Sequence, residues 1–170
     1  DASNIDTRSE TPAEEVEDLF SSSNNYFADL EEAATDLGNN IIRGGRLLEG
    51  DLTEFARSKL GVTITHEAKL PADVGRLGKL SSWEPENRTL TLLSTASPAN
   101  RRFLVARLIA GRSQGEWIKA FLEDQAVLTS DASRERAGRA LSAYAASAML
   151  MPYETFLETA RSVRYDIDAL

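Results

Sequence analysis

The side chains that most often bind metal ions or attack substrates are scarce in this sequence. Its 170 residues include one histidine, His66, and no cysteine. Catalytic zinc is usually held by two or more histidines, and thiolates hold structural zinc and iron-sulfur clusters. These 170 residues therefore contain neither a two-histidine zinc motif nor a cysteine-based site. His66 ends a predicted strand beside Glu67 and has no partner at a triad spacing, so we interpret it as structural or exposed.

Arginine is the residue type best suited to bind a ligand here. It provides 15 of the 19 basic side chains, and its planar fork of donors suits carboxylate and phosphate groups. The net charge is −11 over residues 1–54 and +3 over residues 55–170. The acidic first third argues against direct DNA binding, whereas the remainder is compatible with a small anion. The alternative is that these arginines only keep helix surfaces soluble.

Two further patterns relate to nucleotide binding. The run Gly44-Gly45-Arg46 resembles part of a phosphate loop, but no Gly-Lys-Ser/Thr follows it and no strand precedes it. We therefore interpret it as a helix terminator. Four aromatic residues could stack on an adenine ring: Trp83, Trp117, Tyr144 and Tyr153. Trp117 lies on an apolar helical stripe, which favours a place in the core.

Length and composition indicate one soluble domain with an appendage. The chain is 42% hydrophobic and 27% charged, with a net charge of −8, which is enough apolar material for one core. No stretch has the roughly 18 apolar residues that a membrane span needs, and residues 1–10 lack the features of a signal peptide. We expect a cytoplasmic protein without a membrane partner.

The appendage is predicted to be a long acidic amphipathic helix over residues 11–45, after an irregular tail over residues 1–10. Thr11, Pro12 and Glu14 provide a cap, a first-turn proline and a capping box. Apolar residues then recur at helical spacing as far as the Gly44-Gly45 pair. Such a helix could pack on its own domain or pair with a second copy, and we expect a homodimer or a domain-linking role.

The rest of the chain is predicted to be an α+β fold, mainly helical, with a small three-stranded sheet. Asp51 and Glu54 have the spacing of a helix cap. Ser97 and Pro98 mark the start of another helix. Alanines crowd residues 140–148, which predicts a helix at the domain centre. The predicted helices cover residues 52–60, 97–111, 115–124, 131–149 and a stretch from Pro152, and the predicted strands cover residues 62–65, 77–83 and 88–93.

Several of these segments, taken in order, resemble one known family. They are Gly-Val-Thr-Ile at 61–64, Asn-Arg-Thr-Leu-Thr-Leu at 87–92, Arg-Arg-Phe-Leu-Val-Ala-Arg at 101–107, Ala-Met-Leu-Met-Pro-Tyr at 148–153 and Arg-Tyr-Asp-Ile at 164–167. Over residues 50–165 the chain resembles the ImmA/IrrE-like domain, a zincin-like (metallopeptidase-like) fold. The closest likeness is to the version found behind an XRE-type helix-turn-helix in bacterial regulators of short-chain fatty-acid metabolism. Residues 166–170 look like the start of a truncated following element.

The resemblance also implies that the zinc motif of this family has been lost. In the peptidase members, the helix that opens with the Arg-Phe segment carries His-Glu-x-x-His. The matching places here hold Arg107, Leu108 and Gly111, and the place of a further acidic ligand holds Leu141. We therefore expect no metal and no peptidase activity.

What remains, by the same resemblance, is a cleft between the sheet and two helices that senses a metabolite such as a short-chain acyl-CoA. Arg107 would provide positive charge, Gly111 would leave room, and Tyr144 lies one turn after Leu141. The alternative for Arg107 is an ion pair with Glu135. The expected ligand-binding residues are Arg102, Arg107, Gly111, Leu141 and Tyr144.

Three functions follow, in decreasing order of preference. The first is an effector-binding domain that controls a helix-turn-helix outside this sequence, with DNA contacted only through that element. The second is a dimerisation or protein-interaction domain with a degenerate, ligand-free pocket, and the third is an enzyme of unrecognised type. The first two differ in whether Arg101, Arg102, Arg107 and Arg112 converge on a cavity or point into solvent.

Overall fold

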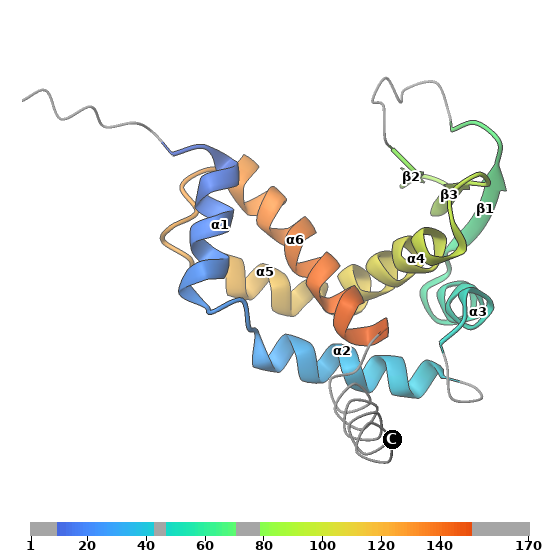
Figure 1. Ribbon diagram of the computed structural model, residues 1–170, viewed down its shortest axis with the longest axis horizontal. Coiled ribbons are helices and arrows are strands. Elements are labelled where there is room, and N and C mark those ends of the chain that lie inside the picture. The colour runs from blue at the N-terminus through green and yellow to red at the C-terminus, as the bar shows by residue number, and fades with distance from the viewer. Residues whose placement is uncertain (1–9, 43–46, 71–78, 151–170) are drawn as a thin grey trace, which may run out of the picture.

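The computed structural model describes residues 10–42, 47–70 and 79–150. Within these residues the chain forms mainly helices, with one small sheet (Figure 1). The helices are α1 (Pro12–Ser22), α2 (Ala28–Ile41), α3 (Glu49–Leu60), α4 (Pro98–Ser113), α5 (Gly115–Glu123) and α6 (Asp131–Leu150), and the strands are β1 (Thr63–Glu67), β2 (Ser81–Glu84) and β3 (Thr89–Leu93). The predicted fold class is confirmed. No helix in the described ranges has the length and apolar content to cross a membrane.

The sheet has the order β1-β3-β2, so β3 is the central strand. It pairs parallel with β1 and antiparallel with β2, and Leu90 lies opposite both Ile64 and Trp83. Leu90 and Leu92 of β3 are buried, because alternate residues of a strand point to the same face. The sheet thus presents an apolar face, and Figure 1 places it beyond α4, on the right of the view.

Helix α6 lies at the centre of the helical part and packs against α1, α2, α4 and α5 (Figure 1). Ala137, Leu141, Ala145 and Ala146 of α6 are fully buried. Small side chains let neighbouring helices approach α6 closely, and this confirms the predicted central place of the alanine-rich helix. One close approach is at Gly38 of α2, where an added Cβ atom would lie 2.5 Å from a backbone oxygen of α6.

The expectation of one long N-terminal helix is wrong, because α1 and α2 are separate helices. The chain turns between them at Asn24 and Asn25, whose φ angles of 53° and 54° lie in the left-handed region. Asparagine adopts the left-handed region more readily than most residues do. A residue in this conformation interrupts the hydrogen bonding of a right-handed helix. The helix start was predicted correctly, since Thr11 and Glu14 form the capping box.

The apolar stripe of this segment was also predicted correctly, but the sequence did not decide whether the stripe packs on its own domain or against a second copy. Its residues are buried within the same chain, in a core shared with α6: Val16, Leu19, Phe27, Leu30, Ala34 and Ile41. A helix whose apolar stripe is already covered has no such stripe to offer a second copy. An expected homodimer would therefore need another surface.

The remaining boundaries differ from the predictions by a few residues. Helix α3 begins at Glu49 rather than residue 52, because Asp51 accepts a hydrogen bond from the Leu48 backbone N–H at 3.1 Å and so sits inside the first turn. Strand β1 extends to Glu67, and α4 and α6 end within two residues of their predicted ends. The tail at 1–9, the glycine pair at 44–45, the helix from Pro152 and residues 166–170 lie outside the described residues.

Candidate ligand-binding cleft

A cavity of about 770 Å³ lies between the sheet and helices α4, α5 and α6. Its wall combines a row of apolar side chains with a set of cations. The apolar ones are Trp83, Leu90, Leu104, Leu108, Ile118 and Leu122, and the cationic ones are Lys79, Arg107, Arg112, Lys119, Arg134 and Arg139. This is where the resemblance places a cleft between the sheet and two helices, with α5 as a third wall.

The periodicity of each element explains which of its residues reach the cleft. Helix α4 contributes positions three or four residues apart, from Leu104 to Gly111 and Arg112, and α6 contributes a similar face from Arg134 to Ser142. From the edge strand β2 and the residues before it come Lys79, Ser81 and Trp83, which alternate along the chain. Cations from four separate stretches of sequence therefore meet around one cavity.

The cleft is strongly cationic, because among the described residues of its wall six basic side chains face a single acid, Glu135. The partner of Glu135 is Arg139, at 3.7 Å and one helical turn away, with both side chains largely exposed. Arg107 is exposed and, among the described residues, forms no ion pair. The alternative of an Arg107–Glu135 pair is therefore not what the structure shows. A cavity lined by one sign of charge attracts ligands of the opposite sign.

Arg112 also contacts the aromatic wall of the cleft. Its guanidinium carbon lies 4.6 Å from the ring centroid of Trp83, within the range of a cation–π interaction. The contact joins the last turn of α4 to β2 across the cavity. It holds Trp83 where a ligand entering the cleft would meet the indole ring.

Only two of the five expected site residues line the cleft, Arg107 and Gly111. Leu141 is fully buried in the core. The Arg102 side chain is not part of the wall, and its Nε atom is buried without a hydrogen-bond partner among the described residues. Nor does Gly111 leave free space, because a Cβ atom there would lie 2.9 Å from the Ser142 hydroxyl. The absence of a side chain at Gly111 lets α4 and α6 approach each other.

Tyr144 points away from the cleft, and the expectation that it shares a pocket with Arg107 is wrong. Its hydroxyl donates a hydrogen bond to the Glu31 carboxylate and accepts one from the Phe27 backbone N–H at 3.3 Å. Burial, aided by the neighbouring Glu31, raises the pKa of Tyr144 to about 12. At 100° per residue, Tyr144 lies about 150° around α6 from the centre of its cleft-facing positions. Tyr144 therefore ties α6 to α2.

The sequence analysis named Arg107 and Arg112 as arginines that could reach a cavity, but it missed the other four cations: Lys79, Lys119, Arg134 and Arg139. The useful signal was the spacing on α6, where Arg134, Gly138 and Ser142 recur every four residues on one face. Following that face, instead of the face of Leu141, would have placed the two arginines of α6 beside Arg107.

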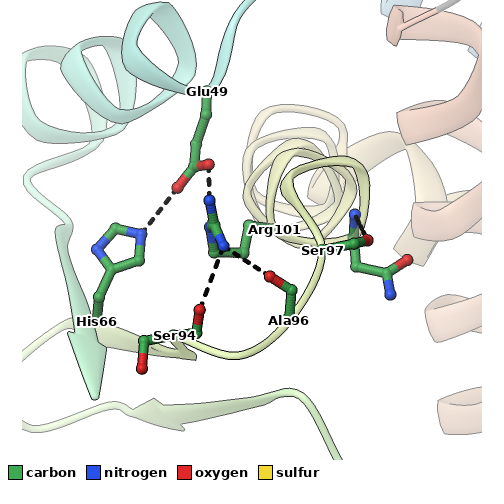
Figure 2. Close-up of polar contacts among 7 residues, drawn as sticks. Glu49, His66, Ser94, Ala96, Ser97 and Arg101 are labelled. Atoms are coloured by element: carbon green, nitrogen blue, oxygen red, sulfur yellow. Dashed lines mark hydrogen bonds and ion pairs between the residues drawn. The ribbon is translucent and has the colours of Figure 1, made fainter. Parts of the chain in front are cut away.

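The polar cluster around Glu49 lies outside the cleft and fixes the start of α4 (Figure 2). Arg101 donates to Glu49 Oε2 at 3.2 Å and to the Ala96 carbonyl oxygen at 2.6 Å, and the other Glu49 oxygen lies 2.8 Å from His66 Nε2. These contacts join α3, β1 and α4. His66 is thus a structural residue, as interpreted from the sequence. Of the four arginines between 101 and 112, Arg107 and Arg112 reach the cleft and Arg101 and Arg102 do not.

The donor groups of the cleft do not fit a zinc ion. Within the described ranges there is no group of three or more His, Cys, Asp or Glu residues that could hold a metal. In the described part of the cavity wall the one carboxylate, Glu135, is surrounded by guanidinium and ammonium groups, which repel a cation.

The family model for the IrrE N-terminal-like domain, Peptidase_M78, matches residues 57–170. The chain belongs to this family. The described geometry agrees, since the matched region contains the sheet and helices α4, α5 and α6 that surround the cleft. The resemblance seen in the sequence is confirmed.

Relatives of the chain are bacterial transcription regulators. It is 32% identical over 161 residues to the HTH-type transcriptional regulator PrpR of Mycobacterium tuberculosis and 33% identical over 163 residues to RamB, also an HTH-type transcriptional regulator of that organism. It is 28% identical over 163 residues to a propionyl-CoA carboxylase regulator of Cereibacter sphaeroides. Each match covers 94% of this chain but only 32% of the relative.

The chain is also similar to the solved structure of a Mycobacterium tuberculosis transcriptional regulator, with a TM-score of 0.80 and 29% identity. That match covers 94% of this chain and 47% of the other.

Proposed function

We propose that this chain is the effector-binding domain of a bacterial transcription regulator, and that its cleft binds an anionic metabolite of the short-chain acyl-CoA class. The observation that carries the proposal is the cavity of about 770 Å³, whose wall has six cations and one acid among the described residues. Its size is within the range typical of small-molecule sites. The name of one relative, a propionyl-CoA carboxylase regulator, refers to the same class of compound.

The two kinds of wall residue suit the two parts of an acyl-CoA. Guanidinium and ammonium groups such as Arg107, Arg139 and Lys119 can pair with the phosphates. The row of leucine and isoleucine side chains offers an apolar surface for a short acyl chain. Because Arg107 is exposed rather than buried, its charge is available to a ligand without a large desolvation penalty.

In the proposed regulator, the helix-turn-helix that contacts DNA lies outside these 170 residues. The acidic helices α1 and α2 are unsuited to contact phosphates themselves, because they would repel DNA. A ligand in the cleft would act by favouring one arrangement of the domain over another, to the extent of its differential affinity.

We also propose that the chain is not a peptidase, despite the name of its family. With one histidine in the whole sequence, the two-histidine zinc motif cannot form, and the residues around the cleft are cations. Elemental analysis of the purified chain should find no stoichiometric zinc. One tightly bound zinc ion per chain would contradict the proposal.

The binding proposal can be tested by native mass spectrometry and calorimetry of this chain with propionyl-CoA, acetyl-CoA and free CoA. Replacing Arg107 or Arg139 by Ala should weaken binding by about 1.5 to 3 kcal/mol, the usual contribution of a charge-assisted hydrogen bond. The matched control is Arg136→Ala, which removes the same charge from an exposed residue of α6 outside the cleft wall. The Arg136→Ala variant should bind the acyl-CoA esters with the same affinity as the parent.

Two outcomes would shift the assignment. If the parent binds none of these esters, the interaction domain with a ligand-free pocket becomes the better description. If Arg136→Ala weakens binding as much as Arg107→Ala, the attraction is diffuse and the cleft is not the site. Dimerisation, which we keep as a prediction for this domain, is checked separately by analytical ultracentrifugation.

A further inference from the structure

A second cavity lies on the opposite face of α5 from the cleft, beside the turn between α1 and α2. Its volume is about 360 Å³, and Tyr26, Phe27, Asp29, Trp117 and Phe121 form most of its wall. Helix α5 separates the two cavities. Its Ile118, Lys119 and Leu122 side chains face the cleft, while Trp117 and Phe121 face this aromatic pocket.

The aromatic rings of this pocket hold one another in place. Trp117 and Phe121 are stacked with centroids 5.0 Å apart and an interplanar angle of 6°. Phe121 in turn meets Phe27 edge to face at 5.6 Å, and Phe27 is buried in the core. Tyr26, by contrast, is 58% exposed at the rim. The pocket thus has a rigid aromatic wall that is anchored to the core and open to solvent on one side.

The charge around the aromatic pocket is opposite to that of the cleft. Among the described residues of its wall, Asp29 is the only ionisable acid or base apart from Tyr26. The segment that supplies most of the wall, residues 10–42, contains nine acids and no lysine or arginine. An aromatic face with a carboxylate at its edge favours a cation, because the ring quadrupole and the charge act in the same direction.

We propose that the aromatic pocket binds an arginine or lysine side chain of a basic segment from another polypeptide. The guanidinium or ammonium group would lie against Trp117 and pair with Asp29. Nucleic acids and acyl-CoA esters are anions, so the same charge excludes them. A purely apolar partner would have to desolvate Asp29 without compensation. The inference is independent of what occupies the cleft.

The test is a nuclear magnetic resonance titration of the intact 170-residue chain with acetyl-tetra-arginine amide. The chain has two tryptophans, Trp83 in the cleft and Trp117 in the aromatic pocket, so their indole N–H signals report on the two cavities separately. Comparison with Trp117→Leu assigns the signals. The peptide should shift the Trp117 signal and leave Trp83 unchanged, and acetyl-tetra-glutamate amide should not shift Trp117.

The controls separate a site from general attraction to an acidic surface. Asp29→Asn should raise the dissociation constant of the arginine peptide about fivefold, as expected for a partly exposed ion pair. Asp36→Asn removes the same charge from an exposed position of α2 outside the pocket wall, and it should change affinity less than twofold. Equal effects of the two substitutions, or no shift of Trp117, would overturn the proposal.

A second copy of the chain is the main rival occupant of the aromatic pocket. Sedimentation of the parent and of Asp29→Asn over a range of concentrations decides between them. A dimer that is lost in Asp29→Asn would assign the pocket to self-association and overturn the proposal of a separate basic partner. A parent that remains monomeric while binding the arginine peptide supports it.

Discussion

The Tyr144 hydroxyl on α6 donates a hydrogen bond to the Glu31 carboxylate on α2, across 113 positions of sequence. The same hydroxyl accepts from the Phe27 backbone N–H at 3.3 Å, where α2 begins. The Phe27 ring also meets the Tyr144 ring edge to face, with centroids 5.2 Å apart. One side chain thus joins the central helix to both the N-cap residue and the first turn of α2.

Tyr144→Phe should lower the free energy of unfolding by about 1 to 2 kcal/mol, because it removes one neutral and one charge-assisted hydrogen bond from a partly buried site while keeping the ring. Urea denaturation measures this difference. Tyr26→Phe is the control, since Tyr26 is exposed, and it should leave stability unchanged. Acyl-CoA affinity should be unaffected by Tyr144→Phe, because Tyr144 is not part of the cleft wall.

The same tyrosine predicts a change of stability at alkaline pH. The pKa of Tyr144 is about 12 in the folded chain, against an ordinary value of 10.0. A group whose pKa is raised by folding stabilises the fold fully below its unfolded pKa and loses this contribution as pH rises through the folded pKa. The difference in unfolding free energy between the parent and Tyr144→Phe should therefore shrink between pH 10 and 12. A constant difference across that window would contradict the assignment.

Glu15 should make the stability of the fold depend on pH in the acid range, with stability lost as pH falls rather than as it rises. Its side chain is buried and accepts hydrogen bonds from the backbone N–H and hydroxyl of Thr129, just before α6. The hydroxyls of Ser133 and Thr129 lower the pKa of Glu15 below its usual 4.5. A carboxyl group whose pKa is lowered by folding stabilises the fold at pH values above its pKa in the unfolded chain. This stabilisation is lost as the pH falls through its pKa in the folded chain.

Glu15→Gln should accordingly lower the urea midpoint of unfolding at pH 7. The difference in urea midpoint between Glu15→Gln and the parent should become smaller as pH falls below about 4.5. Glu17→Gln changes an exposed carboxyl group two positions along α1 and serves as the control. Equal effects of the two substitutions would show that net charge, rather than the contact between Glu15 and Thr129, accounts for the change.

Local signals in the sequence located most of the helices and strands correctly. The caps at Thr11 and Ser97 depend on residues three positions apart, and the structure has both. The break at Asn24 and Asn25 was missed because the apolar stripe continues across it, with Phe20 and Phe27 seven residues apart as in an unbroken helix. Periodicity reports which face is buried, but a short left-handed turn can preserve that spacing.

The cleft was predicted less well than the fold, for a geometric reason. A family motif located Arg107 and Gly111 on α4, but the rotation of α6 about its axis depends on packing with four neighbouring helices. Because the sequence analysis took the face of Leu141 as the cleft wall, it predicted Tyr144 as a wall residue and did not predict Arg134 and Arg139. The cations of the cleft come from residues 79 to 139, and only the tertiary fold brings them together.

The last prediction concerns the glycines at which helices cross. At Gly111 an added Cβ atom would lie 2.9 Å from Ser142 Oγ, and that hydroxyl donates to the Gly138 carbonyl oxygen at 2.8 Å. Gly111→Ala should therefore reduce stability by about 1 to 2 kcal/mol, the overpacking penalty less the gain in helix propensity. Ser142→Gly removes the obstructing atoms, so the double variant should be more stable than the two separate effects predict.

Alanine substitutions at Gly38 and Gly50 should have the largest and the smallest effect on stability, with Gly111→Ala between them. At Gly38 the nearest obstruction is the Met149 carbonyl oxygen, at 2.5 Å, and no side-chain substitution can remove a backbone atom. Gly38→Ala should be the most destabilising of the three alanine variants. A Cβ atom at Gly50 of α3 would have no neighbour within 4 Å, so Gly50→Ala should be neutral or stabilise by up to about 1 kcal/mol. Urea midpoints in any other order would mean that the crossings of α6 with α2 and α4 are looser than the structure shows.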